Sequence, residues 1–390
     1  MTSKKLPHGW KSFIWEQRMS DVVRVLHVLG SMNRGGQETF IMNVYRNIDR
    51  SKVQFDFLIN VQEKCDYEDE IISLGGIIYR IPRRFPNYWK HLKAMRKFFR
   101  ENTQYNVIHQ HTNSLTAIST ALCAKKVNKS KIIYHCHSSK PDKGIVNQIF
   151  DFYYKPKVKE YVTHYFACSE LAAENLFGKH IEQSEVKIIN NAIDSAKFVY
   201  NITVRAQKRK EFGVENKFVI GHVGRFAEAK NHAFLIDVFS QIHKQNDDAV
   251  LLLIGDGERR GAIEKQVQSL NLKKSVIFAG TREDIPELLC AMDVFLFPSL
   301  WEGMPMALVE AQASGLHCVV ADSITKEVDF AGLTEHISLN KSAEYWAGKV
   351  LMYTDSYERK NMQDKVEKAG FDINEITWRL ESFYLSDRQR

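Results

Sequence analysis

The chain has 390 residues, of which 44% are hydrophobic and 26% charged, a composition typical of a soluble globular protein. Its length excludes a single ordinary core and suits two domains of ordinary size. The formal net charge of +7 favours anionic partners, namely phosphorylated ligands, acidic lipid surfaces or nucleic acid, and does not choose among them.

Cysteine spacing and hydropathy exclude further classes. The six cysteines show no C-x-x-C pair, and most lie inside apolar runs, so we expect reduced core residues in a cytosolic protein rather than disulfides or zinc ligands. No stretch reaches the roughly 18 apolar residues that a membrane-spanning helix needs. Lys4 and Lys5 precede no apolar run, which argues against a secretory signal. Residues 1–18 are either a disordered or membrane-touching extension or, as we favour, an artefact of the assigned start, with Met19 directly before the first strand.

From Val22 onward, short apolar runs alternate with amphipathic segments. Such runs indicate strands buried on both faces, and the segments between them suit βαβ crossovers. In the first half we expect a helix over 37–47 and strands over 22–29, 55–59, 77–81, 107–109, 132–134 and 165–168.

A polar, charged stretch over about 195–216 ends this series and is the predicted linker. A second series follows, with strands expected over 218–223, 249–254, 276–278, 294–297 and 317–321, and the pattern from Glu344 onward is helical. The predicted fold is α/β, with two Rossmann-like doubly wound domains that face each other across a cleft. We predict domains over 19–198 and 199–370, after the extension 1–18, and a C-terminal helix over 371–390 that packs back on the N-terminal domain.

Candidate ligand residues follow the strands of the second half, where doubly wound sheets bind their ligands. Gly224 and Arg225 come directly after one strand, with Lys230 five residues further on. Arginine can grip phosphate oxygens in a bidentate manner, and lysine adds a point charge. Taken alone, the two cations fit a solvated loop equally well. Gly255 and Gly280 end the next two strands and by themselves indicate only turn chemistry.

The strongest motif runs from Pro298 to Pro305 and continues to Glu310. Pro305 suits the first turn of a helix, which would place Gly303 and Met304 at a helix N-terminus that offers backbone N–H groups to an anion. Glu302 in the loop can reach sugar hydroxyls. Glu310, near the second turn and flanked by apolar residues, can accept hydrogen bonds from a diol.

In the order and spacing of these motifs, the C-terminal half resembles the donor-binding domain of retaining glycosyltransferases of family 4, which have the GT-B architecture. The stretch 315–328 resembles the exopolysaccharide and capsule-building members in particular. The resemblance implies that Arg225 and Lys230 bind the donor diphosphate, that Glu302 contacts the transferred sugar and that Glu310 contacts the ribose. It covers nearly the whole chain from Met19.

In the N-terminal half, Gly35 and Gly36 resemble the family's glycine-rich donor and acceptor loop, and no G-x-G-x-x-G fingerprint occurs at this turn. His109 with His111, and His135 with His137, have the period-two spacing that places each pair on one face of a strand. His137 matches the histidine that lines the family's reaction centre, and His111 matches a less constant acceptor-side position. Metal binding by these histidines is not favoured.

The segment 80–100 contains eight Lys/Arg and no Asp or Glu, with aromatic residues between them. A basic, aromatic helix suits an anionic membrane surface, and a solvated basic face with a buried aromatic stripe is the alternative. No recognised nucleic-acid motif accompanies the charge. No Asp-x-Asp pair occurs, so we expect no metal or other cofactor, and Arg225, Lys230 and the helix dipole near Gly303 would meet the leaving-group charge.

These observations predict a cytoplasmic enzyme, at the inner face of the cell membrane if the basic segment docks there. It would move a sugar from a nucleoside-diphosphate sugar, with uridine as the first choice of base, to a glycan acceptor that is lipid-linked. The resemblance, and not the composition, implies retention of configuration. One alternative is a nucleotide-sugar epimerase of the same fold, and another is a non-catalytic glycan- or membrane-binding scaffold. A third, a nicotinamide-dependent oxidoreductase, would need the dinucleotide-binding fingerprint that is missing here.

Overall fold

The computed structural model describes residues 22–127, 131–138, 144–355 and 357–386, and the proposed extension 1–18 lies outside them. The chain forms two compact units. Unit 1 runs to Ala192 and takes up the chain again from Ile373, whereas unit 2 comprises Ile193–Asp372. The division therefore falls a few residues before position 198, and the second crossing falls two residues after position 370.

The described part of unit 1 contains a seven-stranded parallel sheet in the order β3-β2-β1-β4-β5-β6-β7. Its strands are largely buried, as expected for apolar runs covered on both faces. The strands are β1 (Val23–Leu29), β2 (Val53–Ile59), β3 (Ile78–Arg80), β4 (Val107–His111), β5 (Lys131–Cys136), β6 (His164–Ala167) and β7 (Val186–Ile188).

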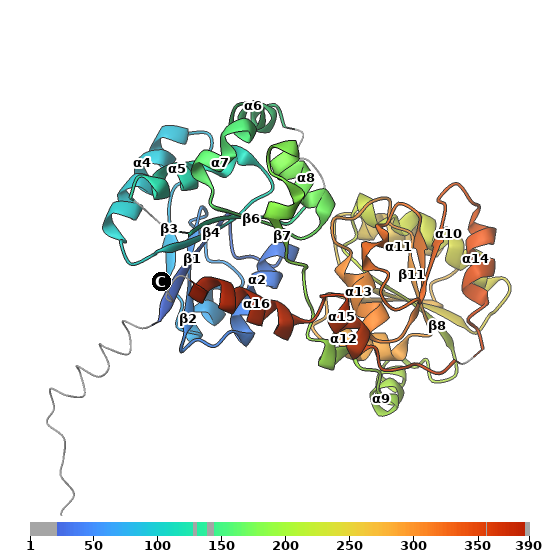
Figure 1. Cartoon of the computed structure of the whole chain (residues 1–390). Helices are drawn as coiled ribbons and strands as arrows, with labels where there is room; N and C mark the ends of the chain where they lie inside the picture. The colour runs from blue at the N-terminus through green and yellow to red at the C-terminus, as the bar shows by residue number, and fades with distance from the viewer. Residues whose placement is uncertain (1–21, 128–130, 139–143, 356, 387–390) are drawn as a thin grey trace, which may run out of the picture. The chain divides into compact units, whose positions relative to one another are not determined.

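Helices cover both faces of this sheet (Figure 1). One face carries α4 (Tyr88–Glu101), α5 (Ser119–Lys125), α6 (Ile145–Tyr154), α7 (Val158–Tyr161) and α8 (Glu170–Phe177). The opposite face carries α2 (Gly36–Asn47) and α16 (Ile373–Leu385), which contact each other, and α16 also contacts β1 and β2. The short α3 (Glu68–Ser73) precedes β3. The C-terminal helix thus buries Ile376, Leu380 and Tyr384 in the core of unit 1.

The described part of unit 2 contains a six-stranded parallel sheet in the order β10-β9-β8-β11-β12-β13. The strands are β8 (Phe218–Val223), β9 (Ala249–Ile254), β10 (Val276–Gly280), β11 (Val294–Phe297), β12 (His317–Ala321) and β13 (Thr334–Ile337). The helices are α9 (Ile202–Phe212), α10 (His232–His243), α11 (Arg260–Ser269), α12 (Ile285–Ala291), α13 (Met306–Ala313), α14 (Ala343–Leu351) and α15 (Gln363–Lys368). The chain order reverses between β8 and β11, where sheets of this kind bind ligands.

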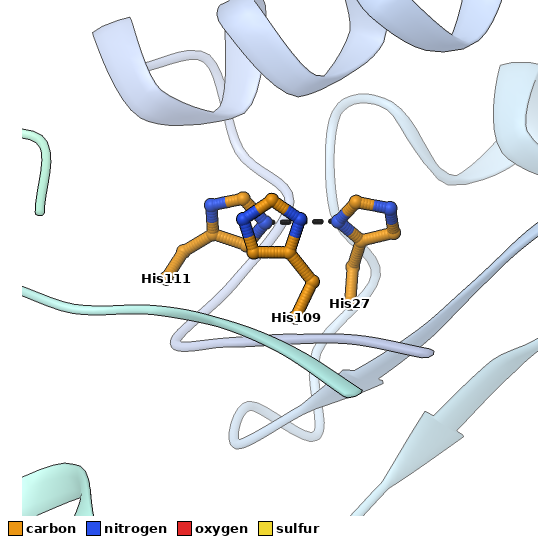
Figure 2. Close-up of side chains that lie close together, drawn as sticks. All are labelled: His27, His109 and His111. Atoms are coloured by element: carbon orange, nitrogen blue, oxygen red, sulfur yellow. Dashed lines mark hydrogen bonds between the residues drawn. The ribbon is translucent and has the colours of Figure 1, made fainter. Parts of the chain in front are cut away.

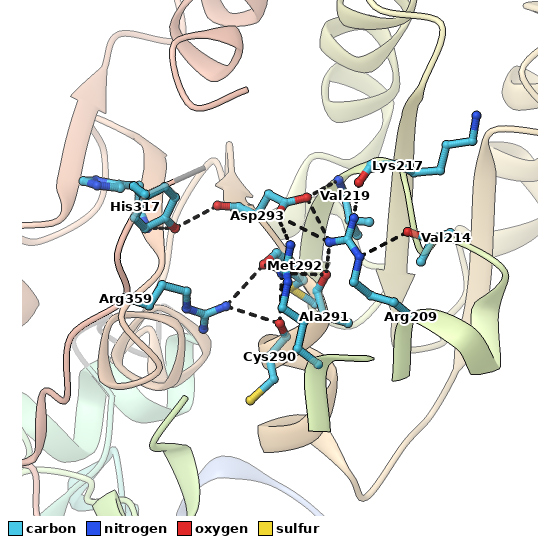
Figure 3. A network of polar contacts seen from close by, with 12 residues as sticks. Arg209, Val214, Lys217, Val219, Cys290, Ala291, Met292, Asp293, His317 and Arg359 are labelled. Atoms are coloured by element: carbon cyan, nitrogen blue, oxygen red, sulfur yellow. Dashed lines mark hydrogen bonds and ion pairs between the residues drawn. The ribbon is translucent and has the colours of Figure 1, made fainter. Parts of the chain in front are cut away.

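The stretch 195–216, predicted as a linker, is instead an ordered part of unit 2. It contains α9, whose Arg205 and Arg209 both pair with Asp293, the residue before β11. Figure 3 shows Arg209 and Asp293 in this network. Arg359 approaches the same segment from the C-terminal side and donates to the carbonyl of Met292. The polar composition of this stretch predicted a solvent-exposed linker. In the structure, its arginines instead donate hydrogen bonds to backbone carbonyls, and the local sequence does not distinguish the two cases.

All eleven predicted strands are present. Four of them match the observed bounds, and the other seven differ by one or two residues at one or both ends. The strands β7 and β13 were not predicted, since three and four residues are too few to show a pattern in the sequence. All six cysteines are buried and none forms a disulfide, as expected: Cys65, Cys123, Cys136, Cys168, Cys290 and Cys318.

Candidate active site

Three glycines lie at the carboxyl ends of neighbouring strands in unit 2. Gly224 donates its N–H to the carbonyl of Ile254 at 2.9 Å, and Gly255 donates to Gly280 at 2.8 Å. Gly255 has a φ of +133°, and a Cβ there would lie 2.2 Å from the Gly224 carbonyl oxygen. The backbones at these two positions approach so closely that only glycine fits at position 255. Turn chemistry alone therefore does not account for Gly255.

The two predicted phosphate ligands have different surroundings. Arg225 is exposed and its guanidinium lies 3.1 Å from Oε2 of Glu258. Lys230 is largely buried, and its Nζ donates to Oε1 of Glu302 at 2.7 Å. The Lys230 ammonium also lies 4.8 Å from the centre of the Phe297 ring, a cation–π distance. Lys230 is thus held in place, whereas Arg225 can swing toward a ligand.

Two hydrogen bonds bring Lys230 and Glu302 together. The loop after β11 is fastened to the loop after β8, because Leu300 donates its N–H to the carbonyl of Ala229 at 2.7 Å. Asn231 donates from its side chain to the carbonyl of Pro298 at 3.2 Å. The sequence predicted Lys230 and Glu302 separately as ligand residues and did not predict that they pair.

Helix α13 begins one residue later than expected. Pro305 is its N-cap and Met306 its first residue, so Gly303 and Met304 form the turn that leads into the helix. A Cβ at Gly303 would meet nothing within 4 Å, which shows open space above this turn. Such a turn before a helix N-terminus is suited to an anion.

Glu310 lies in the second turn of α13. Burial raises the pKa of its carboxyl to about 7, and the nearby Lys230 partly opposes this rise. Among the described residues, no hydrogen bond or ion pair holds this carboxylate. Burial deprives this carboxylate of hydrogen bonds from water, and the two hydroxyls of a bound diol can supply hydrogen bonds in their place.

Two buried histidines, one on each side of the loop after β8, were not predicted. His222 on β8 donates from Nδ1 to the carbonyl of Leu296 at 2.9 Å, and its Nε2 has no hydrogen-bond partner. A Cβ at Gly224 would lie 2.9 Å from that Nε2, which explains the glycine there. His232 stacks on Phe226 with the ring centres 4.1 Å apart. Single histidines in apolar runs give no signal that distinguishes such support from core packing.

In unit 1, Gly35 is the N-cap of α2 and Gly36 its first residue. A Cβ at Gly35 would lie 2.4 Å from Oε2 of Glu38, whereas one at Gly36 would meet nothing within 4 Å. The loop therefore presents an open backbone at the carboxyl end of β1. His137 follows β5 at the same edge, and its ring lies 5.7 Å from that of Phe40 in α2.

Five histidines, of which His137 is half-buried and the other four are buried, form a network on one face of this sheet, and three of them appear in Figure 2. His111 joins two neighbours, with His27 at 2.8 Å on its Nε2 and His137 at 2.8 Å on its Nδ1. His109 lies 3.2 Å from His135 and 2.7 Å from the hydroxyl of Tyr384. Each neutral ring has one N–H, so a ring with two histidine neighbours donates to one and accepts from the other. The hydrogen bonds along each row of linked rings therefore all run in the same direction.

Burial keeps these rings neutral. It lowers the pKa of His27 and of His137 to about 3, and it lowers the pKa values of His109, His111 and His135 well below their usual range. Two groups of three could hold a borderline metal ion, namely His27 with His109 and His111, and His111 with His135 and His137. The ring-to-ring hydrogen bonds already use nitrogen atoms that such an ion would need.

Two Rossmann-like units in one chain, each with loops at the carboxyl edge of a parallel sheet, are the architecture of the GT-B class of glycosyltransferases. Residues 34–197 match the family described as Glycosyltransferase Family 4, and residues 204–366 match Glycosyl transferases group 1. A Bacillus subtilis protein named EpsF, described as a glycosyltransferase, is 36% identical over 93% of this chain and 96% of its own length. The chain therefore belongs to glycosyltransferase family 4.

Two further similarities are informative. An Escherichia coli UDP-Gal:alpha-D-GlcNAc-diphosphoundecaprenol alpha-1,3-galactosyltransferase is 28% identical over 85% of this chain and 89% of its own length. The structure of Anabaena HepE in complex with UDP shares the fold, with a TM-score of 0.74, 18% identity, and coverage of 93% of this chain and 100% of that one. These matches do not favour the epimerase alternative. Among the helices of the described residues, none is both long enough and apolar enough to cross a membrane.

Proposed function

We propose that the enzyme transfers a sugar, with retention of configuration, from a nucleoside-diphosphate sugar to a lipid-linked glycan during surface-polysaccharide assembly. Uridine is the proposed base. Support comes from the E. coli relative, whose name specifies UDP-Gal and a diphosphoundecaprenol-linked acceptor, and from a Staphylococcus aureus relative named for capsular polysaccharide biosynthesis. The HepE structure with bound UDP has the same fold.

The observation that carries the proposal is the Lys230–Glu302 ion pair near the carboxylate of Glu310, which no described residue pairs with. Lys230 and Arg225 would stabilise the negative charge of the departing diphosphate. Glu302 would accept hydrogen bonds from the sugar, and Glu310 from the ribose. The backbone of the turn at Gly303 and Met304, at the start of α13, would receive phosphate oxygens. No metal is part of this proposal.

On the acceptor side, we assign His137 to the reaction centre and His111 to its support. The hydrogen bond between them fixes the ring of His137, and its neutral state lets one ring nitrogen accept a hydrogen bond from an attacking hydroxyl. The open backbone at Gly35 and Gly36 would lie near the substrates at the same edge of the unit 1 sheet.

The proposed place of action is the cytoplasmic face of the cell membrane, contacted through the basic segment 80–100. In α4, Lys90, Lys93, Arg96 and Arg100 are exposed and form no ion pair with a described carboxylate, so they suit lipid phosphates. Arg80 contributes less, because it pairs with Glu68 at 2.6 Å.

The first test is a thermal-shift measurement on the purified protein with UDP, GDP, ADP and NAD, each with excess EDTA. A ligand that binds only the folded state raises the unfolding temperature. A shift with UDP is expected, and a shift with NAD alone would refute the proposal. Turnover with a UDP-sugar and a lipid-diphosphate glycan, followed by NMR of the new linkage, then tests transfer and retention and excludes a non-catalytic scaffold.

A further inference from the structure

Helix α6 has the reverse of the polarity expected for a surface helix. Ile145, Ile149 and Phe152, spaced four and three residues apart, share one face of the helix and are 77%, 61% and 87% exposed. Two of its polar side chains, those of Asn147 and Asp151, face the protein instead. Ser114 donates to Oδ1 of Asn147 at 2.9 Å, and Asp151 accepts from the N–H of Leu115 at 3.4 Å. An exposed apolar stripe of this size marks an interaction site.

The stripe continues onto the start of α4. The ring of Phe150, on the inner side of α6, lies 5.9 Å from that of Tyr88 and 6.4 Å from that of Phe85. Trp89 lies next to Tyr88 with the ring centres 6.1 Å apart and is 76% exposed. Figure 1 shows both helices on the same face of the unit 1 sheet. We call the set Phe85, Trp89, Ile145, Ile149 and Phe152 the α4–α6 surface.

Positive charge borders this surface. A groove of about 560 Å³ begins at Trp89, and its lining includes Lys93, Arg96, Arg100 and Lys126 and no acidic residue among those described. At the other end, the ammonium of Lys157 lies 3.8 Å from the centre of the Tyr153 ring. Apolar side chains between cations are the pattern of helices that lie in the interface of an anionic bilayer.

A second copy of the chain is a poorer occupant. In a symmetric dimer the same patch meets itself, so the cations of one protomer would face those of the other. Phosphate headgroups complement these charges, and the acyl boundary accommodates the apolar stripe. The charge of the border therefore selects an anionic lipid surface over self-association.

We propose that the α4–α6 surface docks the enzyme on an anionic phospholipid bilayer. The side chains of Ile145, Ile149 and Phe152 enter the boundary between headgroups and acyl chains, while the α4 cations contact lipid phosphates. This deepens the membrane contact of the proposed function by naming α6 as the inserted element, and it does not depend on donor or acceptor chemistry.

The test is co-sedimentation of the full chain with vesicles of phosphatidylcholine alone or mixed with phosphatidylglycerol. The wild type is expected to bind the anionic vesicles and to be released by salt. The double substitution Ile149→Ser with Phe152→Ser should weaken binding about tenfold or more, because burying one large apolar side chain alone accounts for such a factor. Lys93→Gln with Arg96→Gln should weaken binding to anionic vesicles only.

Ile202→Ser on α9 is the matched control, since Ile202 is an exposed isoleucine of unit 2, and it should bind like the wild type. Equal binding of the α6 double variant and the wild type would overturn the proposal, as would equal binding to both vesicle types. Loss of a wild-type dimer in the double variant would assign the surface to a second copy instead. The UDP thermal shift, measured on every variant, verifies folding and tests the donor site separately from membrane docking.

Discussion

The ammonium nitrogen of Lys230 lies 2.7 Å from Oε1 of Glu302, although 72 positions separate the two residues in the chain. Only 19% of the Lys230 side chain and 11% of the Glu302 side chain are exposed, so water screens the pair weakly. A donor diphosphate would add negative charge beside Lys230, and a sugar would offer hydroxyls to Glu302. The two residues would then act as one unit in the proposed donor site.

This coupling can be measured with Lys230→Ala, Glu302→Ala and the double variant. Each single change leaves the other charge buried without its partner, which destabilises more than removal of both. We expect an interaction free energy of about 0.5 kcal/mol or more from urea unfolding. We also expect Lys230→Ala to weaken UDP binding roughly 10- to 150-fold, the usual range for a lost charge-assisted hydrogen bond.

Additive effects of the two changes on unfolding would show that the pair does not interact in solution. The exposed Lys217–Asp248 pair of the same unit is a suitable reference, because surface ion pairs contribute little.

The raised pKa of Glu310 predicts opposite pH dependences for stability and for donor binding. The folded pKa of about 7 exceeds the usual value of 4.5, so stability is greatest below 4.5 and falls as the pH rises through 7. The ionised carboxylate accepts hydrogen bonds from both hydroxyls of a ribose diol more strongly than the protonated form does, so UDP affinity should increase over the same range. Calorimetric titration with UDP across this range measures the second effect.

Glu310→Gln keeps the shape of the side chain and cannot titrate. In this variant the affinity for UDP should be lower than in the wild type at alkaline pH and should lose the pH dependence centred near 7. An unchanged affinity at alkaline pH would reject the assignment of Glu310 to the ribose.

The close backbone approach at Gly255 predicts a large difference between two glycine substitutions. Gly255→Ala would place a methyl group 2.2 Å from the Gly224 carbonyl, so we expect a loss of about 2 kcal/mol or more in unfolding free energy. Gly280 has a φ of +69°, and a Cβ at this position would meet nothing within 4 Å. Gly280→Ala should therefore lower the unfolding free energy by only about 1–2 kcal/mol, through backbone strain. Similar losses in urea unfolding would mean that the loop relaxes away from Gly224.

The histidine network predicts that unit 1 loses stability in acid. Its rings stay neutral in the folded state, whereas unfolded histidines gain protons below their usual pKa of 6.5, so stability falls as the pH drops from there toward 3. Each such ring contributes roughly 1.4 kcal/mol per pH unit. His27→Phe, which keeps a ring against Phe55, should flatten this dependence in urea unfolding.

The exposed His180 is the matched control, and His180→Phe should leave the slope unchanged. An equally steep acid dependence in His27→Phe would show that His27 is not one of the groups that titrate on unfolding.

The sequence alone determined the two parallel sheets, because their apolar runs are local patterns that can be satisfied only by burial on both faces. It also indicated Arg225, Lys230, Glu302 and Glu310 as ligand candidates, since each follows a strand in a family-like order. Four unit 2 strands were predicted at the bounds that the structure shows, namely β8, β9, β11 and β12.

Tertiary structure decided what these residues experience. The pairing of Lys230 with Glu302 and the raised pKa of Glu310 depend on which loops meet and how much water they exclude. The histidine network unites β1, β4 and β5 through sheet register, and the apolar face of α6 is exposed because its polar face is bound to Ser114 and Leu115. Burial and long-range contact set these properties, and a local pattern of residues specifies neither.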